Sequence, residues 1–195
     1  MNSNKIFLSL IFILSALGIY CSLIIGISWD EHFANVHALA KIDFLKTLGK
    51  NIEYLKYEES HNPGFYEVVL AFLSNLFPDN WIYEVRHLIN LMLSFATLFG
   101  IFLLAKDNFD KRVALFTVLL CLLNPFFFGM MSVTVRDMPI CFAYVWIIYF
   151  ISKYIKNFST NNIKTTIGLG LAIGFGLGSR LGLVVNFVPI LAMLI

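Results

Sequence analysis

Ile6–Ile27 reads IFLSLIFILSALGIYCSLIIGI, and the charged sequence Ser28-Trp29-Asp30-Glu31-His32 follows it without a spacer. About 20 apolar residues at ~1.5 Å each match the ~30 Å hydrocarbon core of a bilayer, so the run predicts a transmembrane helix. The adjacent carboxylates of Asp30 and Glu31 then lie at the boundary between membrane and water. Charge there is costly unless it is solvated, paired or functional, which makes this boundary a candidate site.

The composition indicates a membrane protein. The chain of 195 residues is 59% hydrophobic and 13% charged, whereas soluble chains carry roughly 25% charged residues. The net charge of +2 comes without any block of like charges, so nucleic acid is not an expected partner. The three cysteines lie in apolar runs and indicate neither a disulfide framework nor structural zinc.

Further apolar runs predict an all-α fold, a polytopic bundle of transmembrane helices forming a single domain over residues 1–195. Beyond Ile6–Ile27, we expect spans at Leu88–Ala105, Val113–Met131, Pro139–Ile155 and Thr165 to about Ser179. A last apolar run, Leu181–Ile195, is shorter than the ~17–25 residues that a span needs. We therefore expect five full spans and a partial sixth.

Basic residues predict the orientation of the bundle. If the spans alternate in direction, seven of these residues fall on one side of the membrane: Lys5, Lys106, Lys111, Arg112, Lys153, Lys156 and Lys164. The positive-inside rule makes that side cytoplasmic, together with the N-terminus. Residues 29–87 then form an external loop.

The external loop is predicted to contain two interfacial helices. Apolar residues recur at steps of three and four between Ile42 and Leu55, as on one face of an amphipathic helix in the membrane interface. A second apolar run, Phe65–Phe77, follows the turn His61-Asn62-Pro63-Gly64 and is too short to span.

Asp30 and Glu31 allow two compatible interpretations. Ser28 with Glu31 forms a capping box, and Asp30 in the first turn suits the helix dipole, so both residues can serve to begin a helix. A carboxylate held rigidly at an interface can also serve catalysis. Asp30 and His37 share a helix face and, with His61, provide ligands for a divalent metal ion; no other cofactor is expected.

Asp137 and several arginines extend the candidate site. Arg136-Asp137 lies at the external end of the fourth span, where it forms either a local ion pair or part of a site. Alternating spans put Asp137 on the same membrane face as Asp30, so we expect the two carboxylates within ~10 Å of each other. Arg86 and Arg180 are either snorkelling anchors or phosphate ligands.

Glycines recur at every fourth position through the fifth span and just beyond it, at Gly170, Gly174, Gly178 and Gly182. This spacing predicts close helix packing. No Gly-Lys-Ser/Thr sequence follows it, so a phosphate-binding loop is not expected.

These motifs, in order, resemble the C-type superfamily of integral membrane glycosyltransferases, in particular protein O-mannosyltransferases and lipid A aminoarabinose transferases. The matching pieces are Trp29-Asp30-Glu31, His61-Asn62-Pro63-Gly64-Phe65-Tyr66, Arg86, Asn124-Pro125 and Arg136-Asp137-Met138-Pro139. Asn62 stands where the family has the first of two prolines, which implies a looser turn. Family members are longer, so we expect this chain to be a truncated N-terminal portion, inactive alone or dependent on a separately encoded C-terminal half.

The resemblance implies transfer of a sugar from a polyprenyl-phosphate donor to an envelope lipid, glycan or protein, on the non-cytoplasmic face of a bacterial inner membrane. It implies Asp30 as general base, Glu31 as a supporting or metal-binding group, and Asp137 as a second acid. The residues implied for substrate and phosphate contacts are Arg86, Arg136, Arg180 and His61.

The alternative is a non-enzymatic small membrane protein or half of a transporter. Transporters place ionisable groups near the middle of the membrane, in broken helices. Here the charged candidates gather at one interface, which favours chemistry at the surface. Contacts with membrane lipids are expected in either case.

Overall fold

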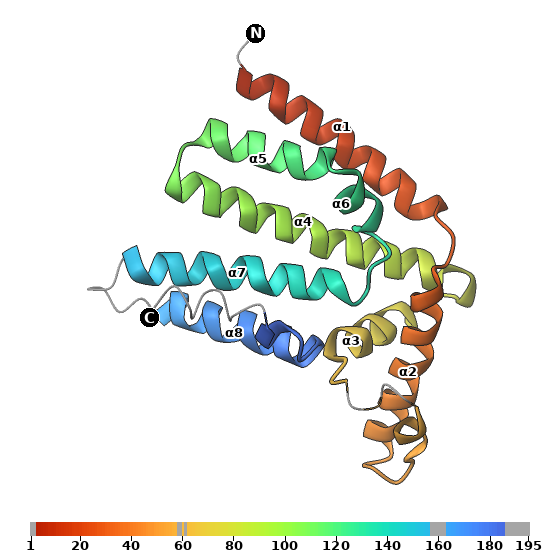
Figure 1. The fold of residues 1–195 in the computed structure, drawn as a ribbon. Helices are drawn as coiled ribbons and strands as arrows, with labels where there is room; N and C mark the ends of the chain where they lie inside the picture. The colour runs from red at the N-terminus through yellow and green to blue at the C-terminus, as the bar shows by residue number, and fades with distance from the viewer. Residues whose placement is uncertain (1–2, 58–59, 61, 157–162, 186–195) are drawn as a thin grey trace.

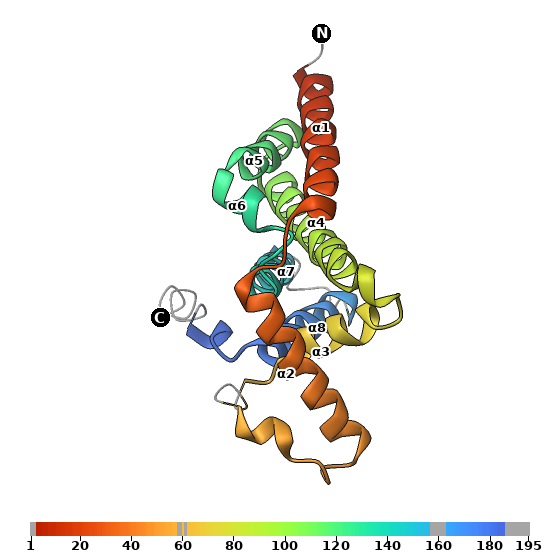
Figure 2. The ribbon, with the colours of Figure 1, turned by 90° about the vertical axis from the view of Figure 1, so that its right-hand side faces the viewer.

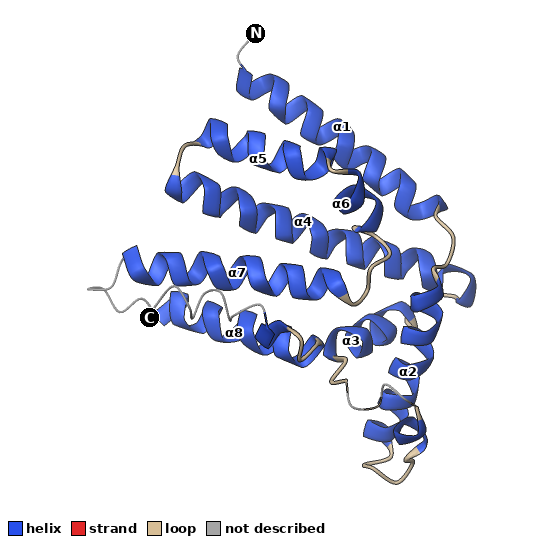
Figure 3. Ribbon diagram, viewed as in Figure 1, coloured by secondary structure: helices blue, strands red, loops and turns tan. Residues whose placement is uncertain are grey.

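The computed structural model describes residues 3–57, 60, 62–156 and 163–185. Within these residues the chain forms helices and no strands (Figure 3), which confirms the all-α fold. In chain order the helices are α1 (Ser3–Ile24), α2 (Trp29–Lys46), η1 (Glu53–Lys56), α3 (Phe65–Ser74), η2 (Asp79–Trp81), α4 (Ile82–Asn108), α5 (Lys111–Leu123), α6 (Pro125–Met130), α7 (Asp137–Lys156) and α8 (Ile163–Ser179).

Five helices lie side by side in the order α1, α5, α4, α7 and α8, and the chain reverses direction from each to the next along the sequence (Figure 1). Helices α2 and α3 lie at one end of this bundle, which we call the α2 end. Figure 2 views the molecule from that end. The opposite end of the bundle carries most of the lysines and arginines that were predicted to be cytoplasmic. They lie at the ends of α4, α5, α7 and α8 that face away from α2 (Figure 1).

Among the described residues, three segments are long and apolar enough to cross a membrane: α1, the segment Asp79–Asn108 that includes α4, and α7. They coincide with three of the predicted spans. The fifth predicted span is the shorter apolar helix α8. Of the last apolar run, residues 181–185 are described, and residues 186–195 lie outside the described part of the chain.

The prediction of one continuous span over Val113–Met131 is wrong, because α5 and α6 are separate helices. The side chain of Asn124 accepts hydrogen bonds from the N–H groups of Phe126 at 3.0 Å and Phe127 at 3.1 Å, and thereby caps α6. Pro125 occupies the start of α6, and a residue before proline is disfavoured in helical geometry. The break therefore has a local cause.

The prediction of one helix over Ile42–Leu55 is also wrong. Helix α2 ends in a Schellman turn, in which the N–H of Gly49 donates to the carbonyl of Phe44 at 2.9 Å and that of Leu48 to Leu45 at 3.1 Å. Leu48 and Gly49 have φ angles of 51° and 81°, in the left-handed region that a helix cannot continue through. Of the later apolar residues, Leu55 lies on η1 and Ile52 directly precedes it.

The second interfacial helix, predicted over Phe65–Phe77, is present as α3. It begins after Gly64, which has a φ of 64°. This left-handed backbone favours glycine, and Lys41 lies close by, since a Cβ atom on Gly64 would lie 2.6 Å from Nζ of Lys41. Lys41 is buried and donates to the carbonyl of Asn62 at 2.8 Å, which ties this turn to α2.

The prediction that the spaced glycines of α8 pack closely against another helix is correct for Gly178 and wrong for Gly170 and Gly174. A Cβ on Gly178 would lie 3.3 Å from Phe65 of α3, whereas a Cβ on Gly170 or Gly174 meets nothing within 4 Å. Helix α8 packs closely on α7 through other glycines, such as Gly168 against Phe150. Gly170 and Gly174 therefore leave open space on the outer face of α8.

Candidate active site

A pocket of about 570 Å³ lies at the α2 end of the bundle; we call it the polar pocket. The start of α2, helix α6, the segment between α6 and α7, and the residue after α8 line it. Its charged lining residues are Asp30, Arg136, Asp137 and Arg180. The structure thus brings Asp30 and Asp137, distant in sequence, to one cavity. Their roles in catalysis stay a prediction.

Asp30 lies exposed in the first turn of α2. A negative charge at this position is stabilised by the helix dipole and by the free N–H groups of the first turn. The exposed carboxylate borders the polar pocket, where a molecule of substrate can reach it. It is therefore placed to accept a proton from a group bound in the pocket.

The two arginines of the polar pocket pair with acids from other parts of the fold. Arg136 Nε lies 3.1 Å from Oε1 of Glu67 in α3, and Arg180 Nη1 lies 3.0 Å from Oδ1 of Asp137. The alternative of a local Arg136–Asp137 ion pair is therefore wrong. The Arg180–Asp137 pair is exposed, and such pairs contribute little to stability, so an anionic ligand can replace Asp137 at Arg180 with little loss.

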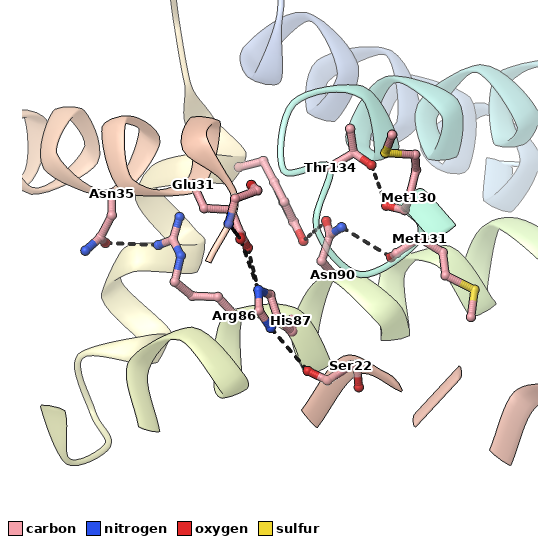
Figure 4. A network of polar contacts seen from close by, with 11 residues as sticks. Ser22, Glu31, Asn35, Arg86, His87, Asn90, Met130, Met131 and Thr134 are labelled. Atoms are coloured by element: carbon pink, nitrogen blue, oxygen red, sulfur yellow. Dashed lines mark hydrogen bonds and ion pairs between the residues drawn. The ribbon is translucent and has the colours of Figure 1, made fainter. Parts of the chain in front are cut away.

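Glu31 does not line the polar pocket, although it is adjacent to Asp30 in sequence. Its side chain is fully buried and contacts His87 of α4, whose Nε2 lies 2.9 Å from one carboxylate oxygen and 3.0 Å from the other (Figure 4). The N–H of Ser28 donates to the same carboxylate at 2.9 Å, as the predicted capping box requires. The supporting role implied for Glu31 stays a prediction.

Arg86 is also buried and lies outside the polar pocket. Its Nη1 donates to Oδ1 of Asn35 in α2 at 3.0 Å (Figure 4), whereas Nε and Nη2 have no hydrogen-bond partner within the described residues. The structure therefore separates Arg86 from Arg136 and Arg180, the two arginines that border the pocket.

Asn90 and Ser94 of α4 form a polar contact that the sequence analysis missed. Asn90 Nδ2 donates to the carbonyl of Met131 at 3.2 Å (Figure 4), and Ser94 Oγ donates to the same carbonyl at 2.6 Å. Both hydrogen bonds hold the segment after α6 against α4. Buried polar residues at helical spacing within an apolar span were the available signal.

Tyr66 of α3 joins this contact by donating to Oδ1 of Asn90 at 3.0 Å. Burial raises the pKa of the Tyr66 hydroxyl, against a smaller opposite effect from the positive charge of Arg86. The hydroxyl therefore stays protonated and remains a hydrogen-bond donor to Asn90. Helix α3 is tied in this way to the same part of α4.

The predicted metal ligands are not gathered around one point by the described residues. Asp30 borders the polar pocket, whereas the ring of His37 packs against that of Tyr57 with centroids 4.6 Å apart. His61 lies outside the described residues. Within the part of the chain that the structure describes, no three His, Cys, Asp or Glu residues are grouped to hold a metal ion. A metal site stays a prediction.

A second cavity of about 620 Å³, the apolar groove, runs along α7 and α8. Aromatic rings of α7 and the open glycines of α8 line it, together with Phe65 of α3. Its lining reaches Gly178, and Ser179 and Arg180 follow directly in the chain. The groove therefore ends two residues before Arg180, which lines the polar pocket.

Comparison with protein families gives a match over residues 61–195 to a model described as dolichyl-phosphate-mannose-protein mannosyltransferase. The matched region includes Arg136, Asp137, Arg180 and the apolar groove, and Asp30 precedes it. Comparison with curated proteins and with solved structures gave no significant match.

Proposed function

The chain belongs to the dolichyl-phosphate-mannose-protein mannosyltransferase family, and from this premise we propose that its polar pocket transfers a sugar from a polyprenyl phosphate to an acceptor hydroxyl or amine. The observation that supports this most directly is the meeting of two carboxylates and two guanidinium groups in one pocket. The acceptor is an envelope lipid, glycan or protein. The family favours this activity over the alternative of a transporter half.

The proposed reaction assigns each charged group a task. Asp30 takes the proton of the acceptor as its oxygen or nitrogen forms a bond to the anomeric carbon of the sugar. The bond from that carbon to the phosphate oxygen breaks, and the polyprenyl phosphate leaves with the electron pair. Arg180 and Arg136 stabilise the negative charge that develops on the phosphate. Asp137 is the second acid and orients Arg180 before the donor binds.

The apolar groove supports a donor that carries a long lipid chain. An isoprenoid chain is apolar and flexible, so the aromatic rings and glycines along α7 and α8 provide a suitable surface. The groove reaches Gly178 next to the pair Ser179-Arg180, so a phosphate at Arg180 and a chain in the groove can belong to one molecule.

Filling the groove tests this assignment. Gly174→Leu is expected to raise the KM for a long-chain polyprenyl-phosphate mannose by about tenfold, because the added side chain displaces about two buried methylene groups of the donor, each contributing ~0.8 kcal/mol. The protein should fold normally, since a Cβ on Gly174 meets nothing within 4 Å. The measurement is the initial rate of transfer as a function of donor concentration, with long-chain and short-chain donors.

Ile167→Phe provides the control, because Ile167 is exposed on α8 and does not line the groove. It should leave both KM values unchanged, and Gly174→Leu should leave the KM of the short-chain donor unchanged. An equal effect of Gly174→Leu on both donors would remove the groove from the donor site.

We also place the polar pocket on the non-cytoplasmic face of a bacterial inner membrane, with the N-terminus in the cytoplasm. The basic residues that flank the spans lie at the end of the bundle opposite α2, and such residues favour the cytoplasm. Lys50→Cys and Asn108→Cys, each in a background without native cysteines, test this placement because both positions are exposed.

In intact cells an impermeant maleimide should modify Lys50→Cys and should reach Asn108→Cys only after the membrane is permeabilised. The opposite pattern would invert the topology and put the polar pocket in the cytoplasm. A signal from both positions before permeabilisation would show that the reagent entered, and lower reagent concentrations would then resolve the two sites.

The experiment that tests the proposed function is transfer of labelled mannose from polyprenyl-phosphate mannose in membranes of cells expressing the full gene. Labelled lipid, glycan and protein products are separated, which also identifies the class of acceptor. Labelled product that depends on Asp30 supports the proposal. Wild-type membranes that form no more product than membranes without the gene would overturn it.

A further inference from the structure

A buried ion pair connects three helices next to the polar pocket. Glu31 of α2 and His87 of α4 have side-chain exposures of 0% and 1%. Nδ1 of His87 lies 3.1 Å from the carbonyl oxygen of Ser22 near the end of α1, and Nε2 faces the Glu31 carboxylate. The two side chains therefore join the end of α1, the start of α2 and the first half of α4 (Figure 4).

The hydrogen bonds around His87 require one shared proton. A carbonyl oxygen only accepts hydrogen bonds, so Nδ1 carries a proton toward Ser22. Nε2 then donates to a Glu31 carboxylate if the ring is charged, or accepts from a protonated Glu31 if the ring is neutral. In both cases the pair has no net charge and holds one proton between its two groups. Because the pair is neutral as a whole, its complete burial carries a smaller desolvation penalty than burial of a single charge.

We propose that His87 and Glu31 are positioning residues, which share one proton and fix the start of α2 so that Asp30 faces the polar pocket. The inference rests on the proposed function for the role of Asp30. Glu31 follows Asp30 directly, and its carboxylate also accepts from the backbone of Ser28. Holding Glu31 therefore holds the backbone on both sides of Asp30.

The neighbouring residue of α4 adds a second contact to the same helix. Arg86 donates to Asn35, one turn farther along α2 than Glu31, so α2 stays attached to α4 when the Glu31 contact is lost. The other wall of the pocket is held by Asn90, which donates to the carbonyl of Met131. Loss of the Glu31–His87 pair should therefore displace the Asp30 side of the pocket and leave the arginine side in place.

Two substitutions of Glu31 separate positioning from direct chemistry. In Glu31→Gln the amide oxygen can accept from Ser28, and the amide NH₂ can donate to Nε2 of a neutral His87, so both contacts survive without the shared proton. In Glu31→Ala both contacts are lost. We expect Glu31→Gln to keep kcat within about threefold of wild type and Glu31→Ala to lower kcat about 100-fold, as small misplacements of catalytic groups do.

The KM for the donor should change little in both variants, because Arg136 follows the Met131 segment that Asn90 holds and Arg180 follows α8, which neither variant alters. His87→Ala keeps the contact between Glu31 and Ser28, so its kcat should fall no further than that of Glu31→Ala. The double variant should match Glu31→Ala, because Glu31→Ala alone already removes both contacts. The thermal unfolding midpoint of each purified variant in detergent identifies any that lost the fold.

The position of α2 can be measured independently of activity, as the distance between two spin labels. Spin labels on Trp29→Cys and Leu181→Cys, both exposed positions at the rim of the bundle end, report how α2 sits relative to the end of α8. The distance distribution should be equally narrow in wild type and Glu31→Gln, and broad or shifted in Glu31→Ala.

Each outcome separates this inference from the proposed function. Equal kcat losses in Glu31→Gln and Glu31→Ala, with unchanged distances, would show that the Glu31 carboxylate acts directly and overturn the inference. An unchanged distance distribution in Glu31→Ala would overturn it as well. Absence of transfer by the wild-type protein would contradict the proposed function alone, because the distances would still report whether the pair positions α2.

Discussion

Asp30→Asn is expected to lower the rate of sugar transfer by about 10²–10⁴-fold, the range that general base catalysis contributes. The amide keeps the shape of the carboxylate and still suits the first turn of α2, but it cannot accept the acceptor proton. The side chain is exposed at the polar pocket, so the substitution should not affect folding or membrane insertion. The measurement is the initial rate of mannose transfer at equal amounts of membrane-inserted protein.

Asp79→Asn is the matched control, because Asp79 is an exposed acid at the start of η2 and does not line the polar pocket. It should transfer at the wild-type rate. If Asp30→Asn transferred as fast as Asp79→Asn, Asp30 would have no role as a base, and Asp137 would be the remaining candidate in the pocket.

Arg180→Ala is expected to lower kcat/KM for the donor by about 10–100-fold. A hydrogen bond to a charged group contributes roughly 1.5–3 kcal/mol. Arg136, whose Nε also pairs with Glu67, keeps part of the positive charge at the phosphate when Arg180 is removed. Arg180→Lys should give an intermediate value, because lysine keeps the charge but loses the planar, bidentate geometry. Steady-state rates over a series of donor concentrations measure both variants.

The control for charge alone is Arg112→Ala, at the exposed start of α5 and at the end of the bundle opposite the pocket. It should leave kcat/KM unchanged. A loss in Arg112→Ala equal to that in Arg180→Ala would attribute the effect to the total charge of the protein, and the phosphate contact of Arg180 would then be wrong.

The long helices of the bundle were predictable because each depends on one continuous apolar run. Helices α1, α4 and α7 meet that condition. The break at Asn124 was also readable, since asparagine before proline favours a cap, but the apolar composition on both sides outweighed it in the prediction. The turn after α2 similarly depended on Gly49, one residue within an otherwise helical pattern.

The sequence was sufficient to predict which residues of the polar pocket share one membrane face. It was not sufficient to predict which of them form ion pairs with each other. Alternation of the spans brings Asp30 and Asp137 to the same end, and both border the pocket. Which arginine meets which acid depends on how α3 and α8 pack, as the Arg136–Glu67 and Arg180–Asp137 pairs show. Glu31 likewise pairs with His87 only because α4 turns that side chain toward α2. The residues around Glu31 in the sequence do not indicate this orientation.

The division of the third apolar run into α5 and α6 has a consequence for the bilayer itself. With 13 residues, α5 rises about 20 Å, less than the ~30 Å of hydrocarbon that surrounds it. We therefore expect the lipids beside its exposed Phe116 and Leu120 to thin locally, which relieves the hydrophobic mismatch. A thinned bilayer brings the headgroups closer to α6, which lines the polar pocket, and so shortens the path from the headgroup layer to the proposed site of transfer.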